Sequence, residues 1–140
     1  MADMTLPTSR NDDPRRLRDL LERARGMASG HSVSSVVVGI AGLEGDLLFP
    51  EVVDFIESAL RVDDAIFRMT RERAVLVLSD VDRTGAEDIV ARLLGGFAEQ
   101  YAAVEDPAIS FGFFEITPQR CEVSVKEVLP ALFAFPHPCH

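Results

Sequence analysis

Few residues of this sequence have the types and spacing that metal binding or nucleophilic catalysis requires. The C-terminal stretch PHPCH, residues 136–140, offers three possible metal ligands, and His31 and Cys121 are two more. A structural zinc site usually takes its ligands as closely spaced pairs, and no CxxC or HxxxH pair accompanies this tail. The histidines fall in an expected loop and in the tail, so no Ser/His/Asp arrangement can be read. We predict no metal, no cofactor and a flexible tail over residues 136–140.

Acidic side chains gather at one expected helix start. Asp80, Asp82, Glu87 and Asp88 surround this start. Carboxylates at a helix N-terminus accept hydrogen bonds from free N–H groups and are stabilised by the helix dipole. This cluster therefore needs no catalytic role.

The apolar pattern predicts the elements that must position any site. Asp13 is a good N-cap before Pro14, and the helix that it begins should close at Gly30. The next elements are expected in the order strand 33–41, helix 49–60, strands 64–69 and 74–79, helix 83–101, strand 108–116, and a short helix 123–134 interrupted by Pro130. The order β-α-β-β-α-β predicts an α+β, ferredoxin-like fold, with an antiparallel sheet and helices on one face.

The N-terminal helix is amphipathic. Its apolar positions are Leu17, Leu20, Leu21, Ala24 and Met27, and its other face is rich in arginine. That charged face is either a solvated surface or a surface for a partner or a second copy. The predicted organisation is a flexible tail over 1–12, this helix over 13–30, a domain over 31–135 and the tail 136–140.

Length and charge exclude several classes of function. A chain of 140 residues with 47% apolar residues is expected to form one packed domain. The net charge of −9 argues against nucleic acid as a partner, because nucleic-acid binders usually present a basic face. No apolar run is long enough to insert into a membrane, and no secretory signal opens the sequence. We expect a reduced, cytoplasmic protein.

The segment RMTRERA, residues 68–74, has the pattern of a hairpin tip. It lies between the apolar runs AIF and VLVL and carries alternating charges but no glycine. Arg71 and Arg73 either contribute contacts to a ligand or keep an edge turn soluble.

Motifs on both sides of this tip follow a recognisable order. Gly45-Asp46 precedes the helix LLFPEVVDFIESAL, and Arg61-Val62-Asp63-Asp64 follows it; after the strand AIFRM come TRERA, VLVL, SDVDRTGAEDIVARLL and ISFGF. Over residues 33–116 this order resembles the catalytic domain of diguanylate cyclases, the GGDEF family. On this register, residues 70–74 occupy the five signature positions. The resemblance implies a degenerate GGDEF domain with the GGDEF-type fold.

The resemblance also implies that catalysis has been lost. In the family, the two signature glycines let a GTP substrate approach the backbone, and acidic side chains bind metal and serve catalysis. Here Thr70 and Arg71 replace the glycines, and Arg73 reverses an acidic charge. Gly39 and Ala41 stand where the family has aspartates on its first strand. We expect no enzyme activity.

Asp46 has two interpretations. By resemblance it matches a guanine contact of the family, whereas without the partners of that contact it is an acid favoured near a helix N-terminus. The glycines at 39, 42 and 45 match neither the dinucleotide fingerprint nor a phosphate loop ending in GKS/T. A tight connection between strand and helix explains them.

A second site of the family is better preserved. Many diguanylate cyclases bind their product, cyclic di-GMP, at an inhibitory RxxD motif, which Arg61 and Asp64 match, and Arg92 matches a second arginine of that site. A guanidinium can pair with guanine O6 and N7 or with phosphate, and a carboxylate can accept the guanine N1 and amino hydrogens. The structural alternative is a local ion pair at a helix C-terminus with an ordinary exposed arginine nearby.

Two functions remain open from the sequence. The first is an inactive GGDEF-like signalling domain that binds cyclic di-GMP through Arg61, Asp64 and Arg92 and recruits a protein partner. The alternative is a nucleotide-independent interaction or scaffold module of the same fold. Both require a protein partner or a homodimer.

Overall fold

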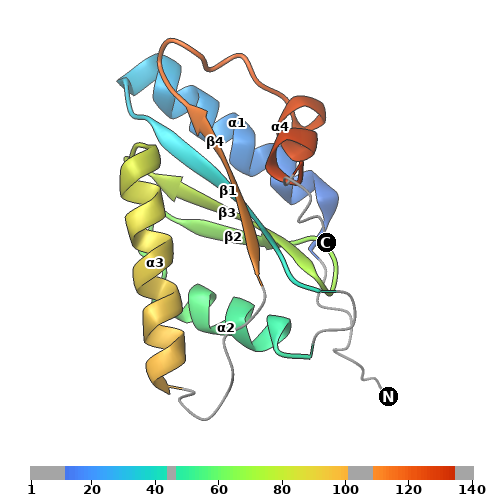
Figure 1. The fold of residues 1–140 in the computed structure, drawn as a ribbon. Coiled ribbons are helices and arrows are strands. Elements are labelled where there is room, and N and C mark those ends of the chain that lie inside the picture. The colour runs from blue at the N-terminus through green and yellow to red at the C-terminus, as the bar shows by residue number, and fades with distance from the viewer. Residues whose placement is uncertain (1–11, 44–46, 101–108, 135–140) are drawn as a thin grey trace, which may run out of the picture.

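A computed structural model of the chain describes residues 12–43, 47–100 and 109–134. The elements in chain order are α1 (Pro14–His31), β1 (Ser35–Ala41), α2 (Phe49–Ala59), β2 (Ala65–Arg68), β3 (Arg73–Ser79), α3 (Arg83–Gln100), β4 (Ser110–Ile116) and α4 (Val125–Leu132) (Figure 1). Three predictions fall outside the described residues. They concern the tail 1–12, of which only Asp12 is described, the tail 136–140 with its histidines, and Asp46. His31, which we expected in a loop, is the last residue of α1.

The described strands form one four-stranded antiparallel sheet in the order β2-β3-β1-β4. The chain order from β1 to β4 is β-α-β-β-α-β, which confirms the predicted α+β class and ferredoxin-like arrangement. Strand β3 is central, because it pairs with both β1 and β2. Strands β2 and β4 are the edges.

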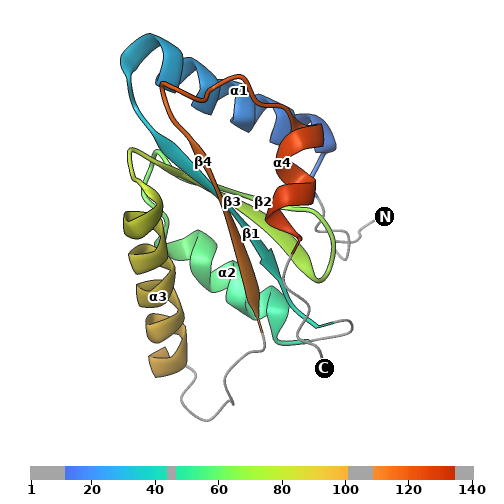
Figure 2. The same ribbon diagram turned by 45° about the horizontal axis from the view of Figure 1, so that its top comes forward.

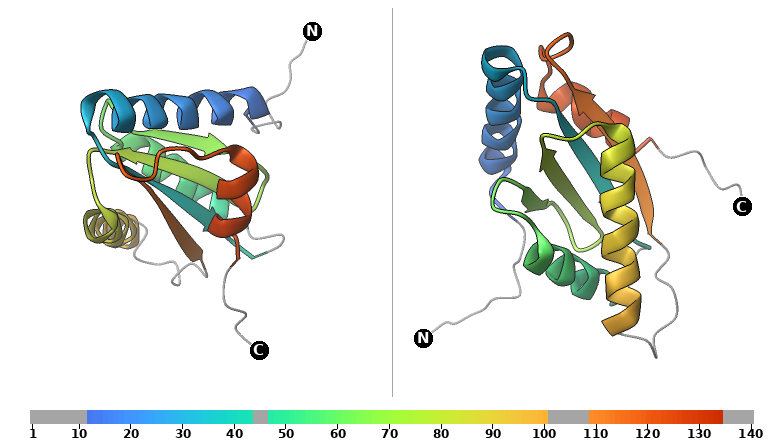
Figure 3. Two further views of the ribbon diagram at one scale, coloured as in Figure 1. Left: turned by 90° about the horizontal axis from the view of Figure 1, so that it is seen from above. Right: turned by 90° about the vertical axis from the view of Figure 1, so that its left-hand side faces the viewer.

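Helices cover both faces of this sheet, although the two helices of the β-α-β-β-α-β unit lie on one face, as predicted. Helices α2 and α3 pack on one face, while α1 and α4 pack on the other (Figures 2 and 3). The reason is that α1 and α4 lie outside the β-α-β-β-α-β unit and supply a second layer. Residues 35–40 are therefore all buried, as expected of a strand covered on both sides.

Alternation along β1 divides the interior into two cores. Val36, Val38 and Ile40 face α2 and α3, in a core that also contains Phe49 and Phe97. Val37 faces the other way, into a core that α1 and α4 complete with Leu17, Leu21, Val128 and Leu132. Burial of these apolar side chains stabilises each layer by about 25 cal/mol per Å² of area removed from water.

Helix α1 begins as predicted and ends differently. The carboxylate of Asp13 accepts a hydrogen bond from the Arg15 backbone N–H at 2.9 Å, and Pro14 stands in the first turn. The helix does not close at Gly30; it runs to His31, and Ser32 caps it with a φ of 56°. A serine can adopt this left-handed conformation at a small cost, so the glycine was a misleading signal.

The cap of α1 should make stability depend on pH. The hydrogen bonds from Arg15 lower the pKa of Asp13 below its ordinary 3.8. A group with a depressed folded-state pKa contributes stability above its unfolded pKa and loses it as pH falls through the folded value. We expect Asp13→Ala to lower the melting temperature at pH 6, with a gap to the unmutated protein that narrows when both are melted below pH 3.8. A gap that stays constant over this range would contradict the assignment.

Helix α4 lies unusually close to the sheet because two glycines face it. Gly39 and Gly112 are opposite each other in the β1–β4 pair. A Cβ on Gly39 would lie 2.7 Å from the Cβ of Leu132, and one on Gly112 would overlap the Leu132 carbonyl oxygen. The predicted interruption at Pro130 is wrong, because α4 continues through this residue. Pro130 is exposed, so water can satisfy the carbonyl that its missing N–H leaves free.

The outer edge of β2 is closed by the residues that lead into α1. The backbone N–H of Asp12 donates to the Arg68 carbonyl at 2.8 Å, and the Arg68 N–H donates to the Asp12 carboxylate at 2.9 Å. The Arg16 guanidinium donates to the Ile66 carbonyl at 2.7 Å. These bonds occupy main-chain groups that an edge strand would otherwise offer to another chain. In the part of the chain that the structure describes, no helix is both long and apolar enough to cross a membrane.

Candidate functional site

The turn from Arg61 to Asp64 connects α2 to the edge strand β2. Helix α2 ends at Ala59, Leu60 is its extended C-cap, and the Asp64 N–H donates to the Arg61 carbonyl at 3.1 Å. Between them, Val62 is 96% exposed. The closed turn places the side chains of Arg61 and Asp64 together, as their spacing predicted.

Arg61 and Asp64 form a two-point ion pair that is anchored to β3. Arg61 donates from Nε to Asp64 Oδ2 at 2.7 Å and from Nη2 to Asp64 Oδ1 at 2.9 Å. The same Nη2 donates to the Ser79 carbonyl at 2.8 Å, and the Ser79 N–H donates to Asp64 Oδ1 at 3.0 Å. Such bidentate, charge-assisted pairs fix the orientation of the guanidinium plane.

Asp64 and Arg61 differ in burial, and this difference gives them different roles. The Asp64 side chain is 3% exposed, whereas that of Arg61 is 53% exposed. Both Asp64 oxygens already accept hydrogen bonds within the protein. The Asp64 carboxylate therefore orients the Arg61 guanidinium. Arg61 Nη1 has no hydrogen-bond partner among the described residues, so its two N–H groups remain available to a ligand.

The surrounding charges hold Arg61 in its cationic form. The hydrogen bonds that Arg61 donates to Asp64 raise the pKa of Arg61 above its ordinary value. Desolvation, the next-largest effect, lowers this pKa, and the charges of Asp64, Asp80 and Asp63 raise it further. The guanidinium is therefore a permanent, oriented cation.

Arg92 reaches the same place from α3. It lies within 3.9 Å of Asp88 one helical turn earlier, and both side chains are 74% exposed, so this pair is weak. Arg61, Asp64 and Arg92 line one open pocket of about 350 Å³. Its other walls are the apolar side chains Phe55, Ala59, Leu60, Ile89 and Leu93. The structure thus brings together the three residues that the sequence singled out.

The hairpin tip lies away from this pocket. The Glu72 N–H donates to the Thr70 hydroxyl at 3.2 Å, and the Gly42 N–H donates to the Glu72 carbonyl at 2.8 Å. The Arg73 guanidinium lies over the Phe133 ring, 4.7 Å from its centroid. Arg73 therefore contacts the end of α4, a role that the sequence did not suggest.

A larger cavity, about 540 Å³, separates this tip from the start of α2. Its basic walls are Arg68, Arg71 and Arg73. Arg68 is neutralised by Asp54 at 3.0 Å and Glu57 at 2.6 Å. This cavity was not predicted from the sequence, although the arginines in and beside TRERA were a visible signal for it.

The acids at the start of α3 serve the helix in part, as we expected. The Asp82 carboxylate accepts from the Gly85 N–H at 2.8 Å, which is an N-terminal capping bond. Among the described residues, no group of three or more His, Cys, Asp or Glu side chains is arranged to hold a metal ion.

Comparison with solved structures identifies the fold. Neither a protein-family model nor a curated protein matches the sequence. The GGDEF domain of DgcB from Caulobacter crescentus, solved in complex with c-di-GMP, superposes with a TM-score of 0.62 at 13% identity, over 84% of this chain and 83% of that one. The chain has the GGDEF-type fold. This confirms the fold that the order of motifs implied.

A second solved structure that is similar to this chain comes from a longer protein chain. PelD from Pseudomonas aeruginosa PAO1, solved from residue 158 to its C-terminus, superposes with a TM-score of 0.62 at 18% identity. The match covers 80% of this chain but only 42% of the PelD chain. At these identities, the likeness defines the GGDEF-type fold and does not define the ligand.

Proposed function

We propose that this chain is a catalytically inactive, cytoplasmic signalling domain that binds cyclic di-GMP in the pocket of Arg61, Asp64 and Arg92. The observation that carries the proposal is the convergence of these three residues, from the 61–64 turn and α3, on one pocket. The DgcB domain, with the same fold, was solved with c-di-GMP bound.

The chemistry of the pocket suits a guanine base. Arg61 Nη1 can donate to O6 and N7, or to phosphate, while Asp64 and Ser79 hold the guanidinium in place. Phe55 supplies an aromatic surface, and stacking a base on such a side chain contributes about 1–3 kcal/mol. A pocket of about 350 Å³ admits a base rather than the whole dinucleotide, so the rest of the ligand would extend over Arg92.

Loss of catalysis is supported by the packing of α4. In GGDEF enzymes, the Mg²⁺ ligands on the first strand would stand at Gly39 and Ala41. At Gly39 even a Cβ would collide with Leu132, so α4 occupies the space that an aspartate would need. Thr70 and Arg71 also replace the signature glycines. The Arg73 guanidinium makes a cation–π contact with the Phe133 ring.

The signal would leave through a protein partner or a second copy of the chain. Val62 is a large apolar side chain that is 96% exposed within the ligand-binding turn. A partner that closes over the ligand would bury it and gain hydrophobic stabilisation.

Calorimetric titration with cyclic di-GMP tests the proposal. We expect the unmutated protein to bind and Arg61→Ala to weaken binding about 100-fold, because it removes charge-assisted hydrogen bonds worth about 1.5–3 kcal/mol each. Arg18→Ala, an exposed arginine of α1 remote from the pocket, is the matched control and should bind normally. Incubation with GTP and Mg²⁺ should yield no cyclic di-GMP.

One observation favours the nucleotide-independent scaffold. Arg61 already joins α2 to β3 through Asp64 and Ser79, which is a structural role that needs no ligand. Under this alternative, no cyclic di-GMP binds even at millimolar concentration, and Arg61→Ala affects only thermal stability.

A further inference from the structure

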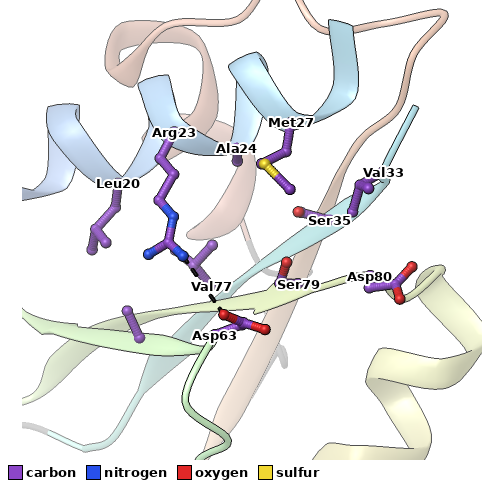
Figure 4. Close-up of a pocket in the computed structure, with 11 residues that line it drawn as sticks. Leu20, Arg23, Ala24, Met27, Val33, Ser35, Asp63, Val77, Ser79 and Asp80 are labelled. Atoms are coloured by element: carbon purple, nitrogen blue, oxygen red, sulfur yellow. Dashed lines mark ion pairs between the residues drawn. The ribbon is translucent and has the colours of Figure 1, made fainter. Parts of the chain in front are cut away.

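A separate cavity lies on the opposite face of the sheet, between α1 and the ends of β1 and β3 (Figure 4). Its volume is about 190 Å³, which equals the liquid volume of about six water molecules. This is smaller than the cavities of roughly 300–1,000 Å³ that hold drug-sized ligands, so only a small molecule fits.

Two serine hydroxyls line this cavity. Ser35 and Ser79 are cross-strand neighbours in the β1–β3 pair, and Figure 4 shows both hydroxyls turned toward the space below α1. Ser35 is only 2% exposed, yet among the described residues neither hydroxyl has a hydrogen-bond partner. Buried hydroxyl groups are normally satisfied, so an unpartnered one aimed into a cavity indicates a ligand or water position.

Opposite charges stand at the mouth of the cavity. Arg23 of α1 and Asp63 of the turn approach to 3.7 Å, and their side chains are 63% and 69% exposed. An exposed pair at this distance is weak, so a ligand can separate it at little cost. Asp80 is a further residue of the lining.

The remaining wall is apolar. Leu20, Ala24 and Met27 project from α1, and Val77 lies on β3 beneath them (Figure 4). Such a surface accepts a short aliphatic group and offers nothing to a larger polar one.

We propose that this cavity binds a small zwitterion of the α-amino acid class with a short aliphatic side chain. The ligand carboxylate pairs with Arg23, its ammonium group pairs with Asp63, and the hydroxyls of Ser35 and Ser79 supply further hydrogen bonds. The aliphatic group packs against Leu20, Met27 and Val77. The cavity combines one guanidinium, one carboxylate, two hydroxyls and an apolar wall in a volume of about 190 Å³, and this combination matches a small zwitterion with an aliphatic group.

The test is an NMR titration of the full chain with L-valine, observing the amides of Val77 and Ser79 and the methyl group of Met27. Isovalerate, which lacks the ammonium group, and isobutylamine, which lacks the carboxylate, are the matched probes. We expect saturable shifts with valine and at least about tenfold weaker binding of either analogue, because each loses one charge-assisted interaction.

Variants separate a ligand site from a structural role. Arg23→Gln should weaken valine binding about tenfold, whereas Arg18→Gln on the same helix should not change it. Ser35→Ala should weaken binding without lowering the melting temperature, because its hydroxyl has no partner in the protein. The proposal is overturned if valine gives no saturable shift at millimolar concentration, if isovalerate binds as well as valine, or if the two arginine variants behave alike.

Discussion

Gly112→Ala should destabilise the domain by about 3 kcal/mol, although it adds a single methyl group. A Cβ at this position overlaps the Leu132 carbonyl oxygen and lies 2.9 Å from its carbon, and these atoms belong to the backbone of α4. A flexible side chain could rotate away, but a helix backbone must move as a unit. Overpacking of this kind usually costs about 1–3 kcal/mol and more where the backbone is involved.

The matched control is Gly95→Ala in α3, where an added Cβ meets nothing within 4 Å. Alanine is favoured over glycine in a helix by up to about 1 kcal/mol, so this variant should be neutral or stabilised. Urea unfolding of the three proteins gives the comparison. Equal midpoints for Gly112→Ala and the unmutated protein would show that α4 does not rest on the glycine pair.

Asp64→Ala should be the most damaging change in the candidate site, with a loss of about 2–3 kcal/mol in the free energy of unfolding. The Asp64 side chain is 3% exposed, and its removal leaves the Ser79 N–H without its acceptor and Arg61 without its anchor. Breaking a buried pair costs about 3–5 kcal/mol, and a smaller loss is expected for this pair because Arg61 is half exposed.

The neighbouring Asp63 provides the control for Asp64. Its side chain is 69% exposed and only weakly paired, so Asp63→Ala should change stability by less than about 0.5 kcal/mol. Denaturant unfolding of both variants, with the Arg61→Ala and Arg61→Ala/Asp64→Ala proteins, completes a double-mutant cycle. Additive effects in that cycle would contradict the coupled role assigned to the pair.

The elements of the fold could be predicted because their signals are local. The apolar runs around residues 33–41 and 74–79 and the helical periodicity of residues 83–101 depend only on neighbours in sequence. The second helical layer could not be placed in this way. The uninterrupted run VVV in β1 is typical of a strand buried on both faces, but nothing local shows that α1 and α4 supply the cover.

In the candidate site, too, the local features could be predicted from the sequence and the long-range contacts could not. The three-residue spacing of Arg61 and Asp64 placed them in one turn, which is a local property. Ser79 could not be found, because it becomes the partner of Asp64 only through its position at the end of β3. Likewise, the pairing of Gly39 with Gly112 depends on the β1–β4 register, and neither glycine alone signals a helix contact.

The two edges of the sheet differ in a way that limits how copies of this domain can assemble. Asp12 and Arg16 occupy backbone groups along β2, while the outer edge of β4 has no main-chain partner among the described residues. When each copy has one blocked edge and one free edge, the sheet of one copy can pair with the sheet of only one other copy. Pairing of two copies through β4 would give a closed, two-fold symmetric dimer whose far ends are both blocked, rather than a growing fibre.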